Sequence, residues 1–253
     1  MADLSGRVAL VTGGGRGIGR GISLALAAAG ADVAINYTRS PEAAEETAAE
    51  VRKLGRRAEL YRANVAEFAE CEAMVAKSVA DFGSIGILVN NAGIASRGNS
   101  VVDTDPAELE RVLSIHAYGA FYCSKLVIPQ MRGLGRGDIV MISSGAAQSF
   151  GARGAPYNMG KAAMESIAYT IAKEERQHGI RANVVAPGLV ESEMGFRLAR
   201  ATRGVKDIRE MDERSPFGFV CQPQDIANAV VFLVGETGRY VTNQRITING
   251  GGF

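Results

Sequence analysis

Short apolar runs alternate with longer segments of helical composition along almost the whole chain. Each run is rich in Val, Ile, Leu and Ala and has a length typical of a buried strand. The runs lie at residues 7–11, 33–37, 58–62, 85–90, 139–142, 182–185 and 245–248. Strands that alternate with helices form parallel sheets, because each crossover passes through a helix that packs on the sheet. The sequence therefore predicts an α/β fold, with one doubly wound parallel sheet of about seven strands and helices on both faces.

The segments between these runs are predicted to be helices. They lie at 42–54, 67–82, 107–131 and 225–234, with one more that begins near Pro156. The segment 107–131 is predicted as one continuous helix. Because ligands of doubly wound sheets bind beyond the carboxyl ends of the strands, functional residues are expected in the loops that follow the strands.

Length and composition favour a single domain that spans residues 1–253. The 28 basic and 27 acidic residues are well mixed and leave a formal charge of +1. Neither nucleic acid nor an anionic membrane surface is therefore an expected partner. No apolar run approaches the roughly 20 residues that cross a bilayer, and the charged Asp3 makes the start of the chain unlike a secretory signal. A cytoplasmic location is expected.

The cysteines and histidines give no pattern of a metal site. Cys71, Cys123 and Cys221 are far apart and lack CxxC spacing, so neither a disulfide framework nor a zinc site is indicated. The two histidines, His116 and His178, are also far apart in the sequence. We therefore expect no catalytic metal and interpret the cysteines as small core residues.

A glycine-rich turn follows the first apolar run. Residues 12–19 read Thr-Gly-Gly-Gly-Arg-Gly-Ile-Gly and lead into an Ala- and Leu-rich helical segment. Glycines allow a tight turn whose amides can approach a pyrophosphate at the start of the helix. A plain turn between strand and helix is the alternative, but the strand before and the helix after it favour dinucleotide binding. The predicted cofactor contacts in this turn are Gly13, Gly15, Arg16, Gly17, Ile18 and Gly19.

A tyrosine and a lysine share one face of the predicted helix near Pro156. Tyr157 and Lys161 are four residues apart, and Ser144 lies thirteen residues before the tyrosine, at the end of a strand. An ammonium group beside a phenol favours the phenolate and lowers its pKa, which provides an acid and base usable near neutrality. Tyr169 and Lys173 repeat the spacing without a serine partner and are interpreted as an ordinary helix face.

Together these motifs resemble the short-chain dehydrogenase/reductase family. The resemblance rests on the glycine turn, the Asn-Asn-Ala-Gly segment at 90–93, Ser144, the Tyr157–Lys161 pair, Pro187-Gly188 and residues 244–251. Within the family, the segment at 187–194 looks most like that of the 3-oxoacyl-acyl-carrier-protein reductases. The resemblance implies one Rossmann-type domain, usually in a homotetramer, that moves hydride between a nicotinamide and a carbonyl or alcohol carbon.

The resemblance also implies roles for four side chains. Tyr157 protonates the forming alkoxide, Ser144 orients the substrate oxygen, and Lys161 holds the nicotinamide ribose and lowers the pKa of the tyrosine. His116 stands where the family usually has Asn. In the family, that Asn completes a proton relay. An imidazole that titrates near pH ~6.5 could itself pass protons, so the hypothesis is that His116 joins the relay. The alternative is a packed core histidine.

Charge indicates NADP(H) as the cofactor more strongly than NAD(H). NAD-preferring relatives carry an acidic residue at the end of the second strand, where this chain has Tyr37. Arg16 and Arg39 are placed to contact a 2′-phosphate, because a guanidinium suits phosphate recognition; the alternative is two solvated arginines. Other cofactor contacts that the resemblance implies are Thr38, Asn64, Val65, Asn91, Ala92, Gly93, Tyr157, Lys161, Pro187, Gly188, Val190 and Ser192.

The substrate is the least determined part. By resemblance, residues at about 191–214 form a lid over the substrate pocket. Basic residues at three-residue spacing there, Arg197 to Arg209, would lie close to one helical face and could meet a phosphate, but six acidic residues balance six basic ones and favour a solvated surface. A 3-oxoacyl thioester is the leading substrate. A small or cyclic secondary alcohol or ketone, and a non-catalytic nicotinamide sensor, are the alternatives.

Overall fold

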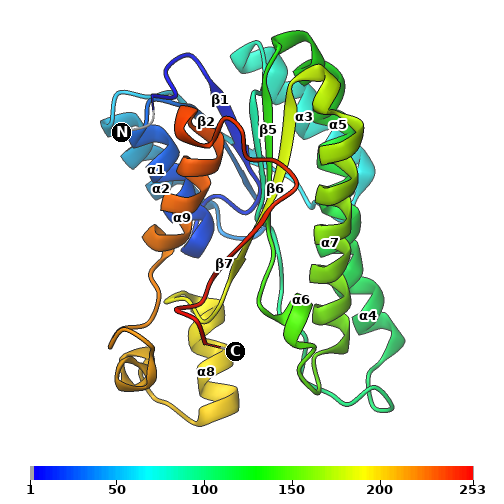
Figure 1. The fold of residues 1–253 in the computed structure, drawn as a ribbon, viewed down its shortest axis with the longest axis vertical. Coiled ribbons are helices and arrows are strands. Elements are labelled where there is room, and N and C mark those ends of the chain that lie inside the picture. The colour runs from blue at the N-terminus through cyan, green and yellow to red at the C-terminus, as the bar shows by residue number, and fades with distance from the viewer. Residues whose placement is uncertain (1–2, 253) are drawn as a thin grey trace.

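One parallel sheet of seven strands forms the middle of the molecule (Figure 1). The structure is a computed structural model that describes residues 3–252. The strands pair in the order β3-β2-β1-β4-β5-β6-β7, and every pair is parallel. Their bounds are β1 Val8–Val11, β2 Asp32–Tyr37, β3 Ala58–Arg62, β4 Ile87–Asn90, β5 Gly137–Ile142, β6 Ile180–Pro187 and β7 Arg245–Ile248. The predicted fold class is confirmed.

Helices cover both faces of this sheet. On one face lie α1 Gly17–Ala28, α2 Pro41–Lys53 and α9 Pro223–Val234; on the other lie α3 Phe68–Phe82, α5 Gly119–Met131 and α7 Ala155–Glu174, with α4 Pro106–Leu113 packed against α7. Two further helices, α6 Ala146–Ser149 and α8 Glu193–Arg203, follow β5 and β6 at the carboxyl ends of the strands (Figure 1). Short 3-10 turns lie at Arg132–Leu134, Arg176–His178, Ile208–Arg214 and Glu236–Gly238.

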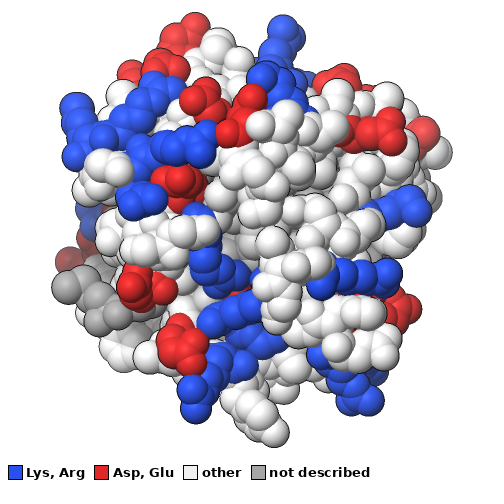
Figure 2. Space-filling view, turned by 90° about the horizontal axis from the view of Figure 1, so that it is seen from above, with Lys and Arg blue, Asp and Glu red and all other residues white. Residues whose placement is uncertain are grey.

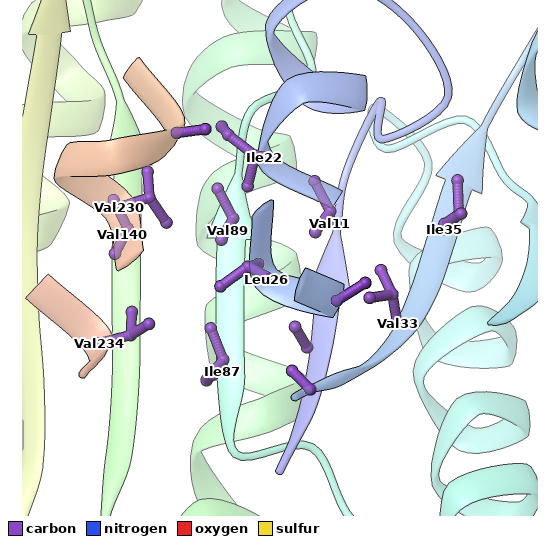
Figure 3. Packing of buried hydrophobic residues seen from close by; sticks show 14 of the residues in the cluster. Val11, Ile22, Leu26, Val33, Ile35, Ile87, Val89, Val140, Val230 and Val234 are labelled. Atoms are coloured by element: carbon purple, nitrogen blue, oxygen red, sulfur yellow. The ribbon is translucent and has the colours of Figure 1, made fainter. Parts of the chain in front are cut away.

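Each face of the sheet has its own apolar core. Under α1 and α9, Ile22 and Leu26 are fully buried against Val11, Val89 and other strand residues (Figure 3). Burial of one such Leu or Ile side chain contributes about 1.5–3 kcal/mol. A second cluster lies between the sheet and α3, α5 and α7. The two cores fix the strands, and therefore the loops at their carboxyl ends.

The strand order reverses at β1, which places a crevice at the carboxyl ends of β1 and β4. From β1 the chain moves outward through β2 to β3 and then returns to β4 on the other side of β1. The connections that leave β1 and β4 consequently cross to opposite faces, and such a switch point is where ligands of open α/β sheets bind. The glycine turn and the Asn-Asn-Ala-Gly segment follow these two strands.

The helix predicted over 107–131 is not continuous. It is divided by a π-helical turn at Ser114–Tyr118, between α4 and α5. A π-turn inserts one extra residue into a helix, and the sequence periodicity does not reveal so small an insertion. The turn carries His116, whose ring is fully buried. This ring lies beside Tyr157.

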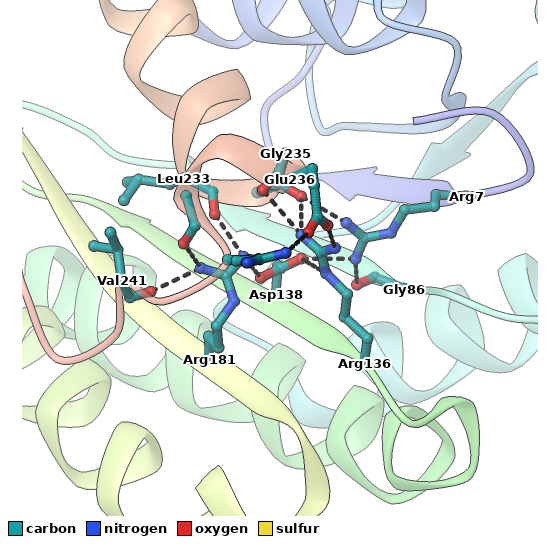
Figure 4. Close-up of polar contacts among 12 residues, drawn as sticks. Arg7, Gly86, Arg136, Asp138, Arg181, Leu233, Gly235, Glu236 and Val241 are labelled. Atoms are coloured by element: carbon teal, nitrogen blue, oxygen red, sulfur yellow. Dashed lines mark hydrogen bonds and ion pairs between the residues drawn. The ribbon is translucent and has the colours of Figure 1, made fainter. Parts of the chain in front are cut away.

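A buried charge cluster closes the opposite end of the sheet (Figure 4). The side chain of Asp138 is 3% exposed and forms ion pairs with Arg7, Arg136 and Arg181. The three arginines also donate hydrogen bonds to backbone carbonyls that follow or end α9, at residues 233–241. Cations at a helix C-terminus satisfy carbonyls that have no partner within the helix. The cluster therefore fixes the end of α9 to the amino ends of the strands.

Charges of both signs are interspersed on the face at the amino ends of the strands, which Figure 2 shows. None of the helices within residues 3–252 combines the length and apolar character needed to cross a membrane. In the same part of the chain, no three His, Cys, Asp or Glu side chains are grouped as metal ligands.

Candidate active site

Ser144 and Tyr157 meet at the carboxyl end of β5. Tyr157 lies in the first turn of α7, which begins at Ala155 with a proline in its first turn. Ser144 follows β5, where the amides of Ser143 and Gly145 donate to the carbonyls of Val185 and Pro187 at 2.8 and 2.9 Å. These bonds extend the β5–β6 pairing beyond Ile142 and fix the serine. The structure thus places the Ser144 hydroxyl close enough to the Tyr157 hydroxyl to lower the pKa of the phenol.

Lys161 lies one turn further along the same face of α7. Its side chain is buried, and Nζ donates to the carbonyl oxygen of Ile142 at 2.7 Å. Nζ is 5.8 Å from the centre of the Tyr157 ring. Burial lowers the pKa of Lys161 to about 7, although the negative charge of Glu165 opposes this change. The amine can therefore change its protonation state near neutrality.

The predicted lowering of the Tyr157 pKa by Lys161 is not found. Burial raises the pKa of this phenol above its ordinary value, and only the hydrogen bond from Ser144 acts in the opposite direction. The physical reason is that the Lys161 amine is directed to the Ile142 carbonyl rather than to the phenol oxygen. Tyr157 is therefore held as the neutral phenol, which is the proton-donating form.

His116 packs beside Tyr157. Its ring is fully buried and lies edge-on to the Tyr157 ring, with 5.3 Å between the ring centres. Nε2 lies 2.8 Å from the carbonyl oxygen of Ile94, to which it donates in one tautomer, and 3.1 Å from the amide of Ile94, from which it accepts in the other. Nδ1 has no partner among the described residues. Burial, followed by the nearby charge of Lys161, lowers the pKa of His116 to about 3. The expected titration near pH 6.5 is therefore wrong, because the ring stays neutral at neutral pH.

The glycine turn has the backbone geometry that could hold an anion. Gly13 and Gly17 have φ of 62° and 53°, a backbone region that suits glycine. Asn36 accepts from the amide of Gly13 at 3.1 Å, and Asn91 donates to the carbonyls of Thr12 and Gly13 at 2.9 and 3.2 Å. The helix α1 then begins without a side-chain cap and without an acidic residue in its first turn. Its free N–H groups fit a pyrophosphate.

Two other glycines of the turn permit close packing. A Cβ on Gly19 would lie 2.1 Å from the carbonyl oxygen of Gly13, and one on Gly15 would lie 2.8 Å from Cα of Ala44 in α2. Gly15, which was predicted as a cofactor contact, is buried against this helix. Its missing side chain therefore serves the approach of α2 to the turn.

The end of β2 forms a hollow with two arginines. Arg39 is exposed there and shares the hollow with Tyr37, Thr38, Pro41 and Arg62. Arg62 ends β3 and is the register partner of Tyr37 in β2, which explains why the two lie together. The sequence prediction did not include Arg62, because a strand partner is not visible from spacing. Among residues 3–252, no carboxylate lines this hollow.

Arg16 is placed differently from Arg39. Its guanidinium forms an ion pair with Glu193 at 2.7 Å, and both side chains are more than half exposed. Glu193 is the first residue of α8. Arg16 therefore connects the glycine turn to the predicted lid.

The remaining predicted cofactor residues lie at or just beyond the carboxyl ends of β3, β4 and β6. They are Asn64, Val65, Asn91, Ala92, Gly93, Pro187, Gly188, Val190 and Ser192. Val65 and Val190 are buried, and the side chain of Asn91 is engaged with the glycine turn. The hydroxyl of Ser192 caps α8 by accepting from the amide of Gly195 at 3.0 Å.

The predicted lid is a small unit with its own apolar cluster. Ala199 of α8 packs with Val205, Ile208 and Met211, which form or precede the following 3-10 turn. The helix α8 ends at Arg203, where Gly204 takes a φ of 68°. The basic residues 197–209 therefore do not lie on one helical face, and that expectation is wrong. Arg209 pairs with Glu191 and Asp212, as expected of a solvated surface.

Two charged residues close to the site were not predicted. Glu165 is buried on α7, four residues after Lys161, and forms an ion pair with Arg245 of β7 at 3.0 Å. The spacing of Tyr157, Lys161 and Glu165 was a visible signal, but Arg245 is distant in sequence. Tyr169 donates to Glu165 at 3.4 Å and Lys173 is exposed, so this second Tyr–Lys pair does not form another site.

Comparisons with known proteins agree with this geometry. A family model described as enoyl-(acyl carrier protein) reductase matches residues 13–252. The chain is 37% identical over 243 residues to the 3-oxoacyl-acyl-carrier-protein reductase FabG of Staphylococcus aureus, with 96% of each chain covered. A 7α-hydroxysteroid dehydrogenase complexed with NADH and 7-oxo glycochenodeoxycholic acid has a TM-score of 0.90 at 31% identity, with 99% of this chain and 95% of that chain covered. A short chain dehydrogenase from Burkholderia cenocepacia J2315 in complex with NADP has a TM-score of 0.88 at 33% identity, with 98% of both covered.

Proposed function

We propose that this chain, which belongs to the short-chain dehydrogenase/reductase family, reduces a 3-oxoacyl thioester to the secondary alcohol with NADP(H). Family membership makes the chain a nicotinamide-dependent oxidoreductase that acts on CH–OH or C=O groups. The observation that carries the proposal is that Tyr157 and Lys161 share one face of α7, with the amine 5.8 Å from the phenol ring, beside Ser144, which lowers the pKa of that phenol. The choice of a thioester is supported by the likeness to an acyl-carrier-protein reductase.

The three side chains divide the proton chemistry among them. A bound nicotinamide supplies the hydride to the carbonyl carbon. The Ser144 hydroxyl donates to the carbonyl oxygen and orients it. Tyr157, kept as a neutral phenol by burial, gives its proton to the alkoxide as it forms. Lys161, with a pKa of about 7, is suited to restore that proton near neutrality.

His116 is assigned to the same relay as a neutral group. The orphaned Nδ1 and the edge-on contact with Tyr157 support this assignment. Because its pKa is lowered to about 3, the ring would pass a proton by exchanging its tautomers rather than as a stable imidazolium.

The NADP(H) preference is supported by the hollow at the end of β2. Two arginines and no carboxylate line it, so a 2′-phosphate would meet positive charge there. Arg16 adds a third guanidinium at the glycine turn if it leaves Glu193. The relatives include proteins bound to NADH and to NADP, so the preference depends on these side chains.

The cofactor preference is tested by removing the arginines. We expect Arg16→Ala with Arg39→Ala, and separately Arg62→Ala, to weaken NADPH binding by about 10- to 100-fold, the effect of losing charge-assisted hydrogen bonds. NADH lacks the 2′-phosphate and is the matched control, so its Kd should stay the same. Fluorescence titration measures both constants. An unchanged Kd for NADPH would defeat the assignment.

The reaction is tested by the loss of NADPH absorbance with acetoacetyl-CoA and with a panel of cyclic ketones. We expect turnover of the thioester, and near-complete loss of turnover in Tyr157→Phe with NADPH binding retained, because the phenylalanine ring lacks the transferable proton. Turnover of cyclic ketones alone would favour the second candidate, a dehydrogenase of small or cyclic alcohols, which the likeness to a hydroxysteroid dehydrogenase supports. Cofactor binding without any turnover would favour a sensor.

We also propose that the protein is a homotetramer in the cytoplasm. Tyr118 and Phe121 are each 51% exposed and lie near Tyr122 and Phe68, which forms a surface cluster of aromatic rings from the π-turn, α5 and the start of α3. Such a patch is typical of an association surface. Light scattering after size exclusion measures the mass, and a monomeric mass would exclude the tetramer. Cell fractionation tests the location.

A further inference from the structure

A buried ion pair lies directly behind Ser144. Glu165 projects from α7 and Arg245 is the first residue of β7, and each side chain is 9% exposed. Nε of Arg245 donates to both carboxylate oxygens of Glu165, at 3.0 and 3.2 Å. On α7, Glu165 lies one turn after Lys161 and two turns after Tyr157, so the three share one face.

The pair also contacts the segment that carries the serine. The hydroxyl of Ser143 donates to Oε1 of Glu165 at 2.6 Å. Nη2 of Arg245 donates to the carbonyl oxygen of Ser144 at 3.1 Å. The end of β5 is therefore joined to α7 through a side chain and to β7 through a backbone carbonyl.

Stability alone does not account for charges at this place. Removing a carboxylate and a guanidinium from water costs free energy, and their mutual attraction offsets this cost only when their geometry is good. An apolar pair of similar volume often gives a fold that is equally stable or more stable. Here the carboxylate oxygens accept from Arg245, Ser143 and Tyr169. No polar atom of the pair is left buried without a partner among the described residues. Apart from the bonds of Tyr169 to Glu165 and of Arg245 to the Thr247 hydroxyl, the contacts of the pair go to residues 143 and 144.

We propose that Glu165 and Arg245 are positioning residues that hold residues 143–144 against α7, so that the Ser144 hydroxyl stays in contact with Tyr157, and that Glu165 is the counter-charge of Lys161. This inference rests on the roles proposed above for Ser144, Tyr157 and Lys161. The pair has two separable effects: its hydrogen bonds hold residues 143–144 in place, and the negative charge of Glu165 acts on the pKa of Lys161.

The charge effect is directed at the lysine. The titratable or charged groups that face Lys161 and Glu165 are Tyr157 and Tyr169 from α7, Arg245 from β7 and His116 from the π-turn. His116 is neutral, and the negative charge of Glu165 raises the pKa of Lys161 against the effect of burial. Loss of this charge should therefore make Lys161 release its proton at lower pH.

Two single variants separate the effects. Glu165→Gln keeps an acceptor for Ser143 but removes the negative charge. The pKa of Lys161 should then fall, and the basic limb of the kcat–pH profile should shift to lower pH by about one unit. Arg245→Lys keeps the charge but loses the fork that reaches Ser144, so kcat should fall about 10- to 100-fold with the limb unmoved. The KM for NADPH should change little in either, because neither residue lies in the predicted cofactor site.

A double variant avoids leaving one buried charge unpaired. Glu165→Leu with Arg245→Met replaces the pair by apolar groups. This double variant should fold, its kcat should be lower than that of the wild type, and the basic limb of its kcat–pH profile should shift to lower pH. The control is Glu175→Leu with Arg132→Met, which removes an ion pair 2.6 Å apart at the end of α7. Its carboxylate is likewise buried, at 6% exposed, whereas its arginine is 47% exposed. The two glutamates are ten residues apart along or at the end of one helix, a distance of about 15 Å. The control variant should therefore keep the kcat of the wild type and the position of the basic limb of its pH profile.

The outcomes are distinguishable. A folded Glu165→Leu/Arg245→Met variant with the kcat and pH profile of the control overturns the inference. Tyr157→Phe is measured in parallel on the same substrate. Turnover in Tyr157→Phe overturns the proposed catalytic roles, and the inference falls with them. Loss of turnover in Tyr157→Phe, together with control-like behaviour of the Glu165 variants, overturns the positioning proposal alone.

Discussion

Replacing Lys161 by Met is expected to stabilise the fold while it abolishes activity. The amine is buried, with the carbonyl of Ile142 at 2.7 Å and the sulfur of Met164 at 3.7 Å as its partners. Burial lowers its pKa from 10.5 to about 7. At 1.36 kcal/mol for each pH unit, this lowering corresponds to about 5 kcal/mol by which the folded state disfavours the charged lysine.

The sign of the pH dependence follows from proton linkage. Below about pH 7, Lys161 is protonated in both the folded and the unfolded protein, so the folded protein bears the whole free-energy cost of the buried charge. Between pH 7 and 10.5 the unfolded chain keeps a proton that the folded chain has released, so the free energy of unfolding of the wild type rises with pH. Methionine has a similar length and no charge. Its substitution leaves the Ile142 carbonyl without this donor, a loss of about 1–3 kcal/mol.

The expected gain of Lys161→Met is therefore about 2–4 kcal/mol at pH 6, and it should shrink by about 1.4 kcal/mol for each pH unit above 7. Guanidinium unfolding of both proteins between pH 6 and pH 9 measures it. Lys173→Met, at an exposed position of the same helix, is the control and should show a small difference without pH dependence. A Lys161→Met protein that is less stable than the wild type at pH 6, or an advantage that is the same at both ends of the range, would refute the reasoning.

Three further predictions concern other parts of the molecule. Asp138→Asn leaves three arginines without their shared carboxylate and should lower the free energy of unfolding by about 3–5 kcal/mol with kcat unchanged; a drop below 1 kcal/mol would contradict it. Gly19→Ala places a Cβ against the carbonyl of Gly13 and should weaken NADPH binding about 10-fold or more. The control is Gly133→Ala, whose Cβ meets no atom within 4 Å and which should leave the Kd for NADPH unchanged. Equal Kd values for the two variants would show that the turn does not need Gly19. His116→Asn should change both kcat and its pH profile, and the relay assignment is wrong if neither changes.

The sequence was most informative where the chemistry is local. A residue four positions after another lies on the same side of a helix, so the Tyr157–Lys161 pair could be placed before the structure was known. The alternation of strands and helices likewise predicted the doubly wound sheet, because a buried strand and a helix have different periods and lengths. The π-turn at Ser114–Tyr118 was missed because it changes the period of a helix by a single residue.

Electrostatic environment could not be derived from spacing. Proximity along α7 suggested that Lys161 would lower the pKa of Tyr157, whereas the structure directs the amine to Ile142 and buries both groups, which raises the pKa of the phenol. The titration of His116 was misjudged for the same reason, since its burial lowers the pKa to about 3.

The amino-acid sequence by itself determined the fold class, the glycine turn and the acid–base pair, because each depends on residues that are near one another in the chain. The tertiary structure alone decided which distant residues complete the site. Arg62 reaches the end of β2 through strand pairing, and Arg245 reaches Glu165 of α7 from the edge strand β7. Those contacts, and the burial that sets the proton affinities of Tyr157 and Lys161, exist only once seven strands and their helices have packed together.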